Sequence, residues 1–316
     1  MKMQRNATAK DAAAPAQKER VNQGISDVVF KWILILPATI AVVALLIFPF
    51  MFTFAASFTD WHLFNLGAPI NFIGFQMWSS VLTSSYIHTT TWNTIFFVGL
   101  ALPLQFLLGM MVALALNAAT VGRTFFRVFF LMPLMFNPIA VVFLIGRLML
   151  QEDIGPINDV IMALGFPRIM WLSNPSMAKI TIVLVDVWQH TAFMILMFLA
   201  GLQSLPQEPF EAAVVDGATA IQRFRYISLP LLGPVALTAV LIRGLDAFKV
   251  VDIIYALTGG GPGQATESVT LTVYRTGVKG GDIAFGSAAS YLLLIMMAVF
   301  TALVLYLTRK WVRISY

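Results

Sequence analysis

The feature that most constrains this chain is a series of long apolar segments that contain few or no charged residues. Hydrophobic residues make up 59% of the sequence and charged residues 11%. A helix needs about 20 mostly apolar residues to cross the hydrocarbon core of a membrane. A membrane barrel would instead alternate apolar and polar residues along strands of about ten residues. Because the apolar segments here are continuous, we expect an all-α, multi-pass membrane protein.

Six segments are long enough to span a membrane, and we predict one transmembrane helix in each. The predicted spans cover residues 32–54, 94–116, 129–149, 180–202, 227–252 and 284–308. The third contains Pro133 and Pro138, which can kink a helix. The spans would form one six-helix transmembrane domain over residues 31–316. Residues 1–30 are polar and are expected to form a disordered cytoplasmic tail.

The positions of lysine and arginine predict the orientation, because the connections on the cytoplasmic side of a membrane protein carry an excess of both. The connection over residues 60–92 contains neither, which suits an external loop. An internal N-terminus puts most of the basic residues of the connections on the cytoplasmic side, among them Arg123, Arg127, Arg223, Arg225 and Arg309. We therefore expect both termini in the cytoplasm.

Composition excludes several classes of function. The net charge of +5 comes from residues scattered over short connections, so no basic face for nucleic acid is expected. Cysteine is absent, and His62, His88 and His190 lack the spacing of metal ligands. No Gly-x-x-x-x-Gly-Lys-Ser/Thr loop occurs, so this chain is not expected to bind nucleotide. The glycine-rich run at residues 259–263 is interpreted as an external turn. We predict no metal, no cofactor and no catalytic residue in this chain.

The connection between the fourth and fifth spans, residues 205–226, predicts a short helix on the cytoplasmic face. Pro209 suits the first turn of a helix, Glu208 and Glu211 complement its positive end, and Gly217 permits a stop after Val215. On composition alone, the favoured interpretation is an interfacial connector with no partner.

A resemblance changes that interpretation. The residues that carry it are Glu211, Ala212, Ala213, Asp216, Gly217 and Ala218, followed by Gln222, Phe224, Ile227, Leu229, Pro230, Leu231, Leu232 and Pro234. This pattern closely resembles the EAA loop of permease subunits of binding-protein-dependent ABC importers. Residues 255–263, 188–189 and 200–206 are similar to the carbohydrate class of that family, in particular to the larger maltose-permease type of subunit.

The resemblance implies a function and a set of partners. The chain would be a permease subunit in the bacterial cytoplasmic (inner) membrane and would translocate a sugar or sugar-like solute. An extracytoplasmic solute-binding protein would deliver the solute, and a second homologous permease subunit would complete a heterodimer. Two separate ATPase subunits would bind ATP and Mg, so this chain would not be an enzyme. The short helix would be the coupling helix that docks into the ATPase, through Glu211, Ala212, Ala213, Asp216 and Gly217.

Polar side chains at membrane depth are the second set of candidate site residues, because such groups usually line a cavity or pair with one another. On the fourth span, the residues at i, i+3, i+4 and i+7 form one stripe: Asp186, Gln189, His190 and Phe193. On the fifth span, charges recur every three residues: Arg243, Asp246, Lys249 and Asp252. The resemblance to the maltose family puts Asp186, His190, Phe193, Arg243 and Asp246 at or beside sugar-contacting positions.

Two interpretations of these charges stay open. They could line the solute path, or the fifth-span charges could form an internal ladder of ion pairs that fixes helix packing. Other functional classes are also open from the residues. An ion-coupled secondary transporter or channel could use the same buried charges, and Asp186 with His190 is the one feature that an intramembrane enzyme could use.

Overall fold

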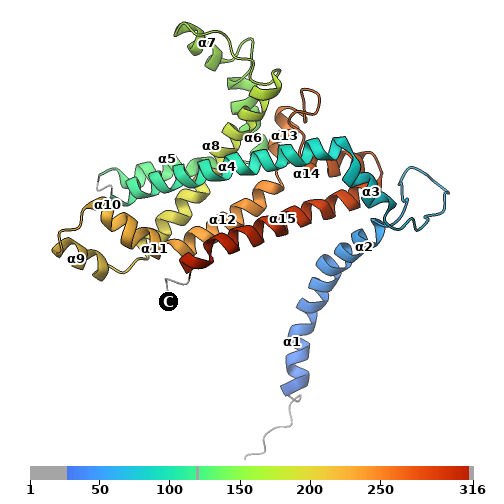
Figure 1. The fold of residues 1–316 in the computed structure, drawn as a ribbon, viewed down its shortest axis with the longest axis horizontal. Helices are drawn as coiled ribbons and strands as arrows, with labels where there is room; N and C mark the ends of the chain where they lie inside the picture. Colours follow the sequence, from blue (N-terminus) through green and yellow to red (C-terminus); the bar gives the residue numbers. More distant parts are fainter. Residues whose placement is uncertain (1–26, 119–120, 313–316) are drawn as a thin grey trace, which may run out of the picture. The chain divides into compact units, whose positions relative to one another are not determined.

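The computed structural model describes residues 27–118 and 121–312 of the chain. All named elements in this part are helices, and the extended pairing found there consists of two isolated bridges, Thr59 with Phe72 and His62 with Asp282. The all-α prediction is confirmed (Figure 1). The predicted tail lies outside the described residues as far as residue 26, and α1 already begins at Asp27. The chain divides into two units between Phe52 and Thr53.

The first unit consists of an apolar helical stretch. Its elements are α1 (Asp27–Val42), the π-helical turn η1 (Val43–Ile47) and α2 (Phe48–Ala56), which continues into the second unit. Leu45 is 73% exposed, and the most apolar part of the stretch has no buried residue. A helix that is apolar all round and exposed needs lipid as its solvent. The predicted first span, residues 32–54, lies inside this stretch.

The centre of the second unit is a pair of long helices, α4 (Ser85–Ala118) and α8 (Pro175–Gln203), that pack along each other (Figure 1). Buried apolar side chains from both fill the core between them. Gly109 allows a close approach, since a Cβ atom there would lie 2.4 Å from the Cβ atom of Met194. Small residues at such crossings are typical of helices packed in a membrane.

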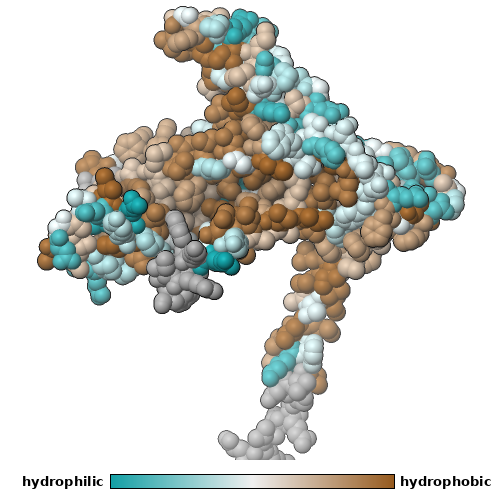
Figure 2. Space-filling model, in the orientation of Figure 1, coloured by the Kyte–Doolittle hydropathy of each residue, from teal (hydrophilic) through white to brown (hydrophobic). Residues whose placement is uncertain are grey.

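Two further helices join this pair: α12 (Gly233–Phe248) packs on both α4 and α8, and α15 (Ile283–Val312) packs on α12. Gly244 of α12 accommodates the ring of Phe300 of α15, because a Cβ atom at residue 244 would lie 2.3 Å from that ring. Figure 2 shows a largely hydrophobic surface over these helices, as lipid contact requires. The predicted second, fourth and sixth spans lie within α4, α8 and α15, each of which extends beyond the predicted ends.

The third predicted span is sharply bent. It is divided into α5 (Arg123–Met135) and a second segment made of α6 (Pro138–Val141) and the π-helical η2 (Val142–Met149), with an angle of 101° between them. Pro138 cannot donate a backbone hydrogen bond, and Asn137 has an extended conformation and caps α6 by accepting from the amide of Ile139.

The fifth predicted span is also bent. The segment α10 (Ala220–Arg223), η3 (Phe224–Ser228) and α11 (Leu229–Leu231) meets α12 at 63°. The described residues therefore contain four helices apolar and long enough to cross a membrane, or up to six if each bent pair is one span. The predicted end of the fifth span at residue 252 is wrong by four residues, because α12 ends at Phe248.

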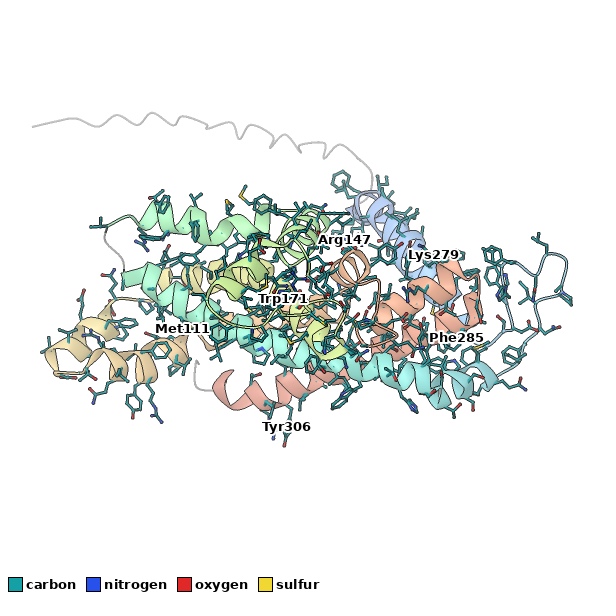
Figure 3. All side chains as sticks on the ribbon, turned by 90° about the horizontal axis from the view of Figure 1, so that it is seen from above. Met111, Arg147, Trp171, Lys279, Phe285 and Tyr306 are labelled. Carbon is teal, nitrogen blue, oxygen red and sulfur yellow. The ribbon has the colours of Figure 1, made fainter. Side chains whose placement is uncertain are left out.

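The remaining elements gather toward the two ends of the second unit (Figure 1). The α9 end carries α9 (Glu208–Val215) and α10, and the opposite end, called the α13 end, carries α3 (Gln76–Thr83), α13 (Asp252–Leu257), α14 (Val269–Thr272) and the π-helical η4 (Val273–Lys279). The short α7 (Pro156–Ala163) belongs to the connection between η2 and α8. In Figure 3, Met111 of α4 lies toward the α9 end and Phe285 of α15 toward the α13 end.

Candidate functional site

A buried cluster of charges joins α8 to α12. Nη2 of Arg243 lies 2.5 Å from Oδ2 of Asp186, and the two side chains are 2% and 7% exposed. Nη1 of Arg243 also pairs with Oδ2 of Asp246, at 3.1 Å. An isolated charge in such a setting would be strongly unfavourable, so the opposite charges of Asp186 and Arg243 compensate each other's burial.

Two neighbours complete the surroundings of Asp186. Nδ1 of His190, one helical turn further along α8, lies 3.0 Å from Oδ1 of Asp186. Gln105 of α4 donates from Nε2 to Oδ2 of Asp186 over 2.9 Å. The cluster therefore connects three of the four packed helices through one carboxylate. Oε1 of Gln105 and Nε of Arg243 are buried without a hydrogen-bond partner in the described part of the chain. The cluster can therefore accept one further hydrogen bond and donate another.

The predicted stripe on α8 separates into a buried half and a more exposed half. Asp186 and Gln189 are buried, and Gln189 donates to the carbonyl of Phe136 at the break between α5 and α6. This hydrogen bond satisfies a carbonyl group at a helix end, so Gln189 holds the bend in place. His190 and Phe193 are partly exposed, and the side chain of Asp246 is 56% exposed.

The hypothesis of an ion-pair ladder along the fifth span holds only in part. Arg243 and Asp246 do pair, but the strongest contact of Arg243 crosses to Asp186 on another helix. The helix ends before Lys249 and Asp252, because α12 stops at Phe248 and Asp252 opens α13. Among the described residues, no ion pair joins Lys249 or Asp252 to the cluster.

The segment predicted to couple to another subunit forms the expected helix. α9 runs from Glu208 to Val215, begins with Pro209 in its first turn and has no buried residue. Gly217 follows with a φ of +77°, a conformation that side-chain-bearing residues rarely adopt. Thr219 and Gln222 then form a capping box that starts α10. The local prediction for this helix and its glycine stop is confirmed.

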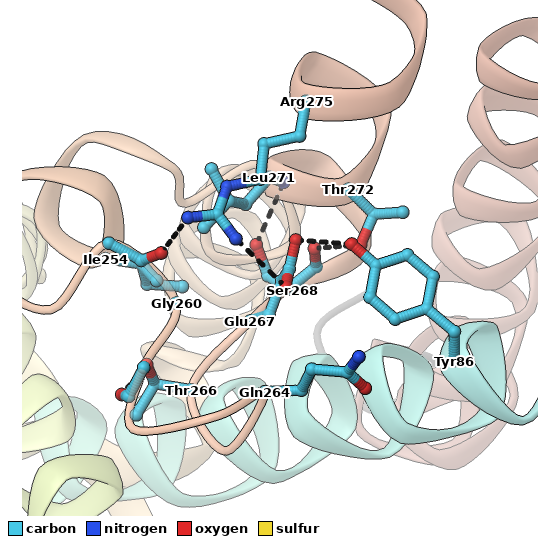
Figure 4. Close-up of polar contacts among 12 residues, drawn as sticks. Tyr86, Ile254, Gly260, Gln264, Thr266, Glu267, Ser268, Leu271, Thr272 and Arg275 are labelled. Atoms are coloured by element: carbon cyan, nitrogen blue, oxygen red, sulfur yellow. Dashed lines mark hydrogen bonds and ion pairs between the residues drawn. The ribbon is translucent and has the colours of Figure 1, made fainter. Parts of the chain in front are cut away.

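A second buried acid, which sequence analysis missed, lies at the α13 end. Glu267 is 1% exposed and accepts a hydrogen bond from the hydroxyl of Tyr86 of α4 over 2.6 Å (Figure 4). Nη1 of Arg275 lies 3.2 Å from its other oxygen, and Nη2 of the same arginine donates to the carbonyl of Gly259. Asn93 of α4 donates to the carbonyls of Gln264 and Glu267.

These contacts fix the glycine-rich run between α13 and α14 against α4. Gly260 has a φ of +91°, and a Cβ atom there would lie 3.3 Å from the Cβ atom of Glu267. The run is thus a turn, as predicted, with a glycine required where it passes the acid. A buried partner for this region could have been suspected from Asn93, directly before the second predicted span, because a buried amide needs partners.

The connection between η2 and α8 contains a carboxylate that accepts several hydrogen bonds from the protein. Glu152 accepts from the amides of Leu172 and Ser173 over 2.8 Å and 2.7 Å and from the hydroxyl of Ser173. Burial raises the pKa of Glu152, but these hydrogen bonds and the charge of Arg168 outweigh burial and lower the pKa below its ordinary value of 4.5. Glu152 therefore holds the start of α8 to the end of η2.

This shift predicts a loss of order in the connection at low pH. A lowered pKa in the folded state stabilises the fold above the ordinary pKa of 4.5, and the effect is lost as pH falls through the folded-state value. The protection factors of the amides in residues 150–174, which correct for the intrinsic pH dependence of exchange, should fall below pH 4.5, while α8 stays protected. In Glu152→Gln the same segment should have lower protection factors at neutral pH, and these should change little on acidification. An identical acid response in the variant would contradict this role of Glu152.

Comparison with known proteins agrees with this architecture. The fold defines a class of protein. It is a polytopic helical membrane protein with a charge cluster in its core and an exposed helix between two spans. Residues 105–313 match the family described as "Binding-protein-dependent transport system inner membrane component". The chain belongs to this family.

Individual relatives carry sugar-related names. The chain is 37% identical over 278 residues to the "Trehalose/maltose transport system permease protein MalF" of Thermococcus litoralis, covering 88% of this chain and 93% of the relative. It is 33% identical over 285 residues to the "Sulfoquinovosyl glycerol transport system permease protein SmoG" of Agrobacterium fabrum, covering 90% and 92%. A chain of a bacterial alginate ABC transporter, solved with an alginate-bound periplasmic protein, superposes with a TM-score of 0.76 at 21% identity, covering 90% of this chain and 95% of that chain, and shows a shared fold.

The family assignment decides among the functional classes left open by the residues. The chain is the inner-membrane permease component of a binding-protein-dependent transport system, as predicted. The alternatives of an ion-coupled secondary transporter or channel and of an intramembrane enzyme do not describe this family. Family membership supports the role of a transport subunit rather than that of an enzyme.

Proposed function

We propose that this permease translocates a sugar or sugar-like solute that an extracytoplasmic binding protein delivers, driven by ATP hydrolysis on separate ATPase subunits. The names of the two relatives described above, which refer to trehalose, maltose and a sulfoquinovosyl glycerol, support a carbohydrate class. The observation that carries the proposal is the polar cluster of Asp186, His190, Arg243 and Asp246 at membrane depth.

The cluster divides into supporting and solute-contacting groups. Asp186 and Arg243 are almost fully buried and hold α8 and α12 in register, while Gln189 holds the bend beside them. His190, Phe193 and Asp246 reach the surface of the cluster and would face the solute. A carboxylate accepts from hydroxyl groups, an imidazole both donates and accepts, and an aromatic ring packs on the apolar face of a sugar. This combination suits a ligand rich in hydroxyl groups.

The α9 end is proposed to be the cytoplasmic end. α4 ends and α5 begins there, so Arg123 and Arg127 lie at that end, and α10 and η3 carry Arg223 and Arg225. An excess of arginine on one side is the usual mark of the cytoplasmic face. The α13 end, with its glycine-rich turn, would then face the binding protein, and both termini would be cytoplasmic.

The exposed helix α9 is proposed to be the coupling helix. An eight-residue helix is too short to be stable alone in water, and α9 has no buried side chain to compensate. Val214 is 56% exposed and Val215 86%. A partner that covers α9 would supply the missing burial, and Glu211, Ala212, Ala213, Asp216 and Gly217 are the residues proposed to meet it. The proposed assembly contains two ATPase subunits, which would bind ATP and Mg, and a second homologous permease.

The experiment that tests the solute path is a substitution of His190. We expect His190→Ala to reduce solute uptake by about tenfold, since one hydrogen bond to a bound ligand contributes roughly 0.5 to 1.5 kcal/mol. Assembly and basal ATP hydrolysis should be retained. The measurement is sugar uptake into proteoliposomes that contain the complete transporter, with saturating binding protein.

The matched control is His88→Ala. His88 is an exposed histidine of α4 whose ring contacts the carbonyl of Leu82, away from the cluster. We expect this variant to transport normally. Wild-type uptake in an assembled His190→Ala transporter would remove His190 from the path, and equal losses in both variants would show a general effect on folding.

A further inference from the structure

A cavity of about 750 Å³ lies at the α9 end, between the ends of α4, α5 and α8 on one side and α9 and α10 on the other. Its volume falls in the range of roughly 300 to 1,000 Å³ that is typical of sites for small organic ligands. The cavity is separate from the charge cluster around Asp186, and none of the cluster residues lines it. Figure 2 shows hydrophilic and hydrophobic residues side by side over α9 and α10.

The lining of this cavity contains more positively charged than negatively charged side chains. Arg123 of α5 and Arg223 of α10 both line it, and Glu211 of α9 is the single acid in the lining. No ion pair within 4 Å joins Glu211 to either arginine in the described part of the chain. Two guanidinium groups from different segments thus face one space with an excess of positive charge. Such groups recognise phosphate through paired, charge-assisted hydrogen bonds.

The arginine of α5 is held in position by its neighbours. With the amide oxygen of Gln203 turned toward α5, Gln203 accepts hydrogen bonds from Nη2 of Arg123 over 2.7 Å and from Arg127. One amide therefore orients two guanidinium groups at the end of α8. Arg223, by contrast, has no hydrogen bond or ion pair from its side chain in the described residues, so its donors are unused. A ligand with several acceptor oxygens would satisfy them.

The rest of the lining is largely apolar. Leu114, Leu202, Leu205 and Phe210 contribute to it beside the arginines. A cationic and apolar pocket between the ends of membrane spans on the cytoplasmic side is the kind of site that binds the headgroups of anionic lipids. We propose that this cavity binds a phosphate-bearing anion through Arg123 and Arg223. The phosphodiester of an anionic phospholipid is the favoured source, because the apolar lining also accommodates the start of its acyl chains.

The proposal rests on the proposed function in two respects, the cytoplasmic position of this end and the coupling role of α9. Phe210 and Glu211 of α9 line the cavity, so an occupant contacts the coupling helix from the side of the membrane. Occupancy would orient α9 for its partner and would make coupling depend on lipid composition. The binding itself can be measured without transport, which separates a failure of this proposal from a failure of the proposed function.

The test is binding of phosphatidylglycerol to the complete purified transporter. Thermal unfolding is followed while mixed micelles of phosphatidylcholine with phosphatidylglycerol, or of phosphatidylcholine alone, are added. A second arm uses inorganic phosphate against sodium chloride of the same ionic strength. We expect phosphatidylglycerol to raise the unfolding temperature of the wild type. Arg123→Gln and Arg223→Gln should each weaken the apparent affinity about fivefold, the effect of one arginine near an anionic lipid surface.

Three variants make the outcome specific. Arg309→Gln removes the same charge near the end of α15, outside the cavity lining, and should bind like the wild type. Arg223→Lys keeps the charge but loses the paired hydrogen bonds of a guanidinium group, so its affinity should lie between those of the wild type and of Arg223→Gln. Arg223→Gln alone carries the test if Arg123→Gln fails to assemble, because the Arg223 side chain forms no hydrogen bond or ion pair within the described residues.

The two arms identify the source of the phosphate. Stabilisation by phosphatidylglycerol that the two cavity variants weaken supports a lipid headgroup. A response to inorganic phosphate alone, with the same variant dependence, supports a soluble phosphorylated ligand in the same site. No response in either arm, or an equal loss in Arg309→Gln, would overturn the proposal.

Discussion

Replacing Arg243 with methionine is expected to destabilise the assembled permease by about 3 to 5 kcal/mol, because it leaves the carboxylate of Asp186 buried without its partner charge. Arg243 is 2% exposed, so water cannot take over the role of the guanidinium group. The remaining neighbours, His190 and Gln105, offer hydrogen bonds but not a permanent positive charge. Thermal unfolding of the purified transporter in detergent measures the effect.

A second substitution should recover most of that stability. In Asp186→Asn with Arg243→Met the buried charge is absent, and the asparagine can still accept the hydrogen bond from Gln105. We expect the double variant to be at least 2 kcal/mol more stable than Arg243→Met alone, since removing both members of a buried pair is often nearly neutral. Uptake should remain impaired, because the polar lining has changed.

Asp246→Asn is the matched control for burial. It removes an acid that pairs with the same arginine, but its side chain is 56% exposed. Exposed ion pairs contribute about 0 to 1 kcal/mol, so we expect a small change in unfolding temperature. A large loss in Asp246→Asn together with a small one in Arg243→Met would show that the pair with Asp186 is solvated, and the cluster would lose its structural role.

The sequence predicted the helices well because their signal is local. Spanning segments are long and apolar, and Pro209 with Gly217 marks both ends of α9 within a few residues. The bends were harder to predict. The proline pair at Pro133 and Pro138 indicates a kink, but the angle of 101° depends on Asn137 capping the second helix and on Gln189 holding the carbonyl of Phe136.

Contacts between distant residues were the least predictable part of the site. Spacing of three along one helix correctly paired Arg243 with Asp246, but it could not reveal that Arg243 also pairs with Asp186, which lies on a different helix. The same limit hid Glu267, whose partner Tyr86 lies on α4. A buried charge in a membrane protein must have a partner, yet only packing shows which one.

Losing the carboxylate of Glu211 or the glycine at residue 217 is expected to abolish most uptake, by different physical routes. α9 has no buried residue, so its position depends on a partner, and Glu211→Ala should weaken docking by about 1 to 3 kcal/mol, the scale of a charge-assisted hydrogen bond. Gly217 has a φ of +77°, and Gly217→Val should cost about 1 to 2 kcal/mol or more in that conformation. The neighbouring chain would move to relieve this strain and α9 would leave its docking position.

Two control variants reproduce these changes elsewhere in the chain. Gly67→Val introduces the same side chain at a φ of +88°, where a Cβ atom also has nothing within 4 Å. Asp159→Ala removes an acid from the first turn of α7, which has eight residues like α9. Both lie outside the α9 segment, so they should keep the ATPase bound and uptake close to normal.

The measurements are co-purification of the ATPase and uptake of solute, made on all four variants and on His190→Ala. We expect Glu211→Ala and Gly217→Val to lose both, whereas His190→Ala should keep the ATPase and lose only uptake. This contrast separates coupling from the solute path, because the cluster around Asp186 and the α9 segment share no residue. Normal ATPase retention and normal uptake in both coupling variants would mean that α9 is an interfacial connector, and the lipid or a neighbouring permease would then have to supply the burial that α9 lacks.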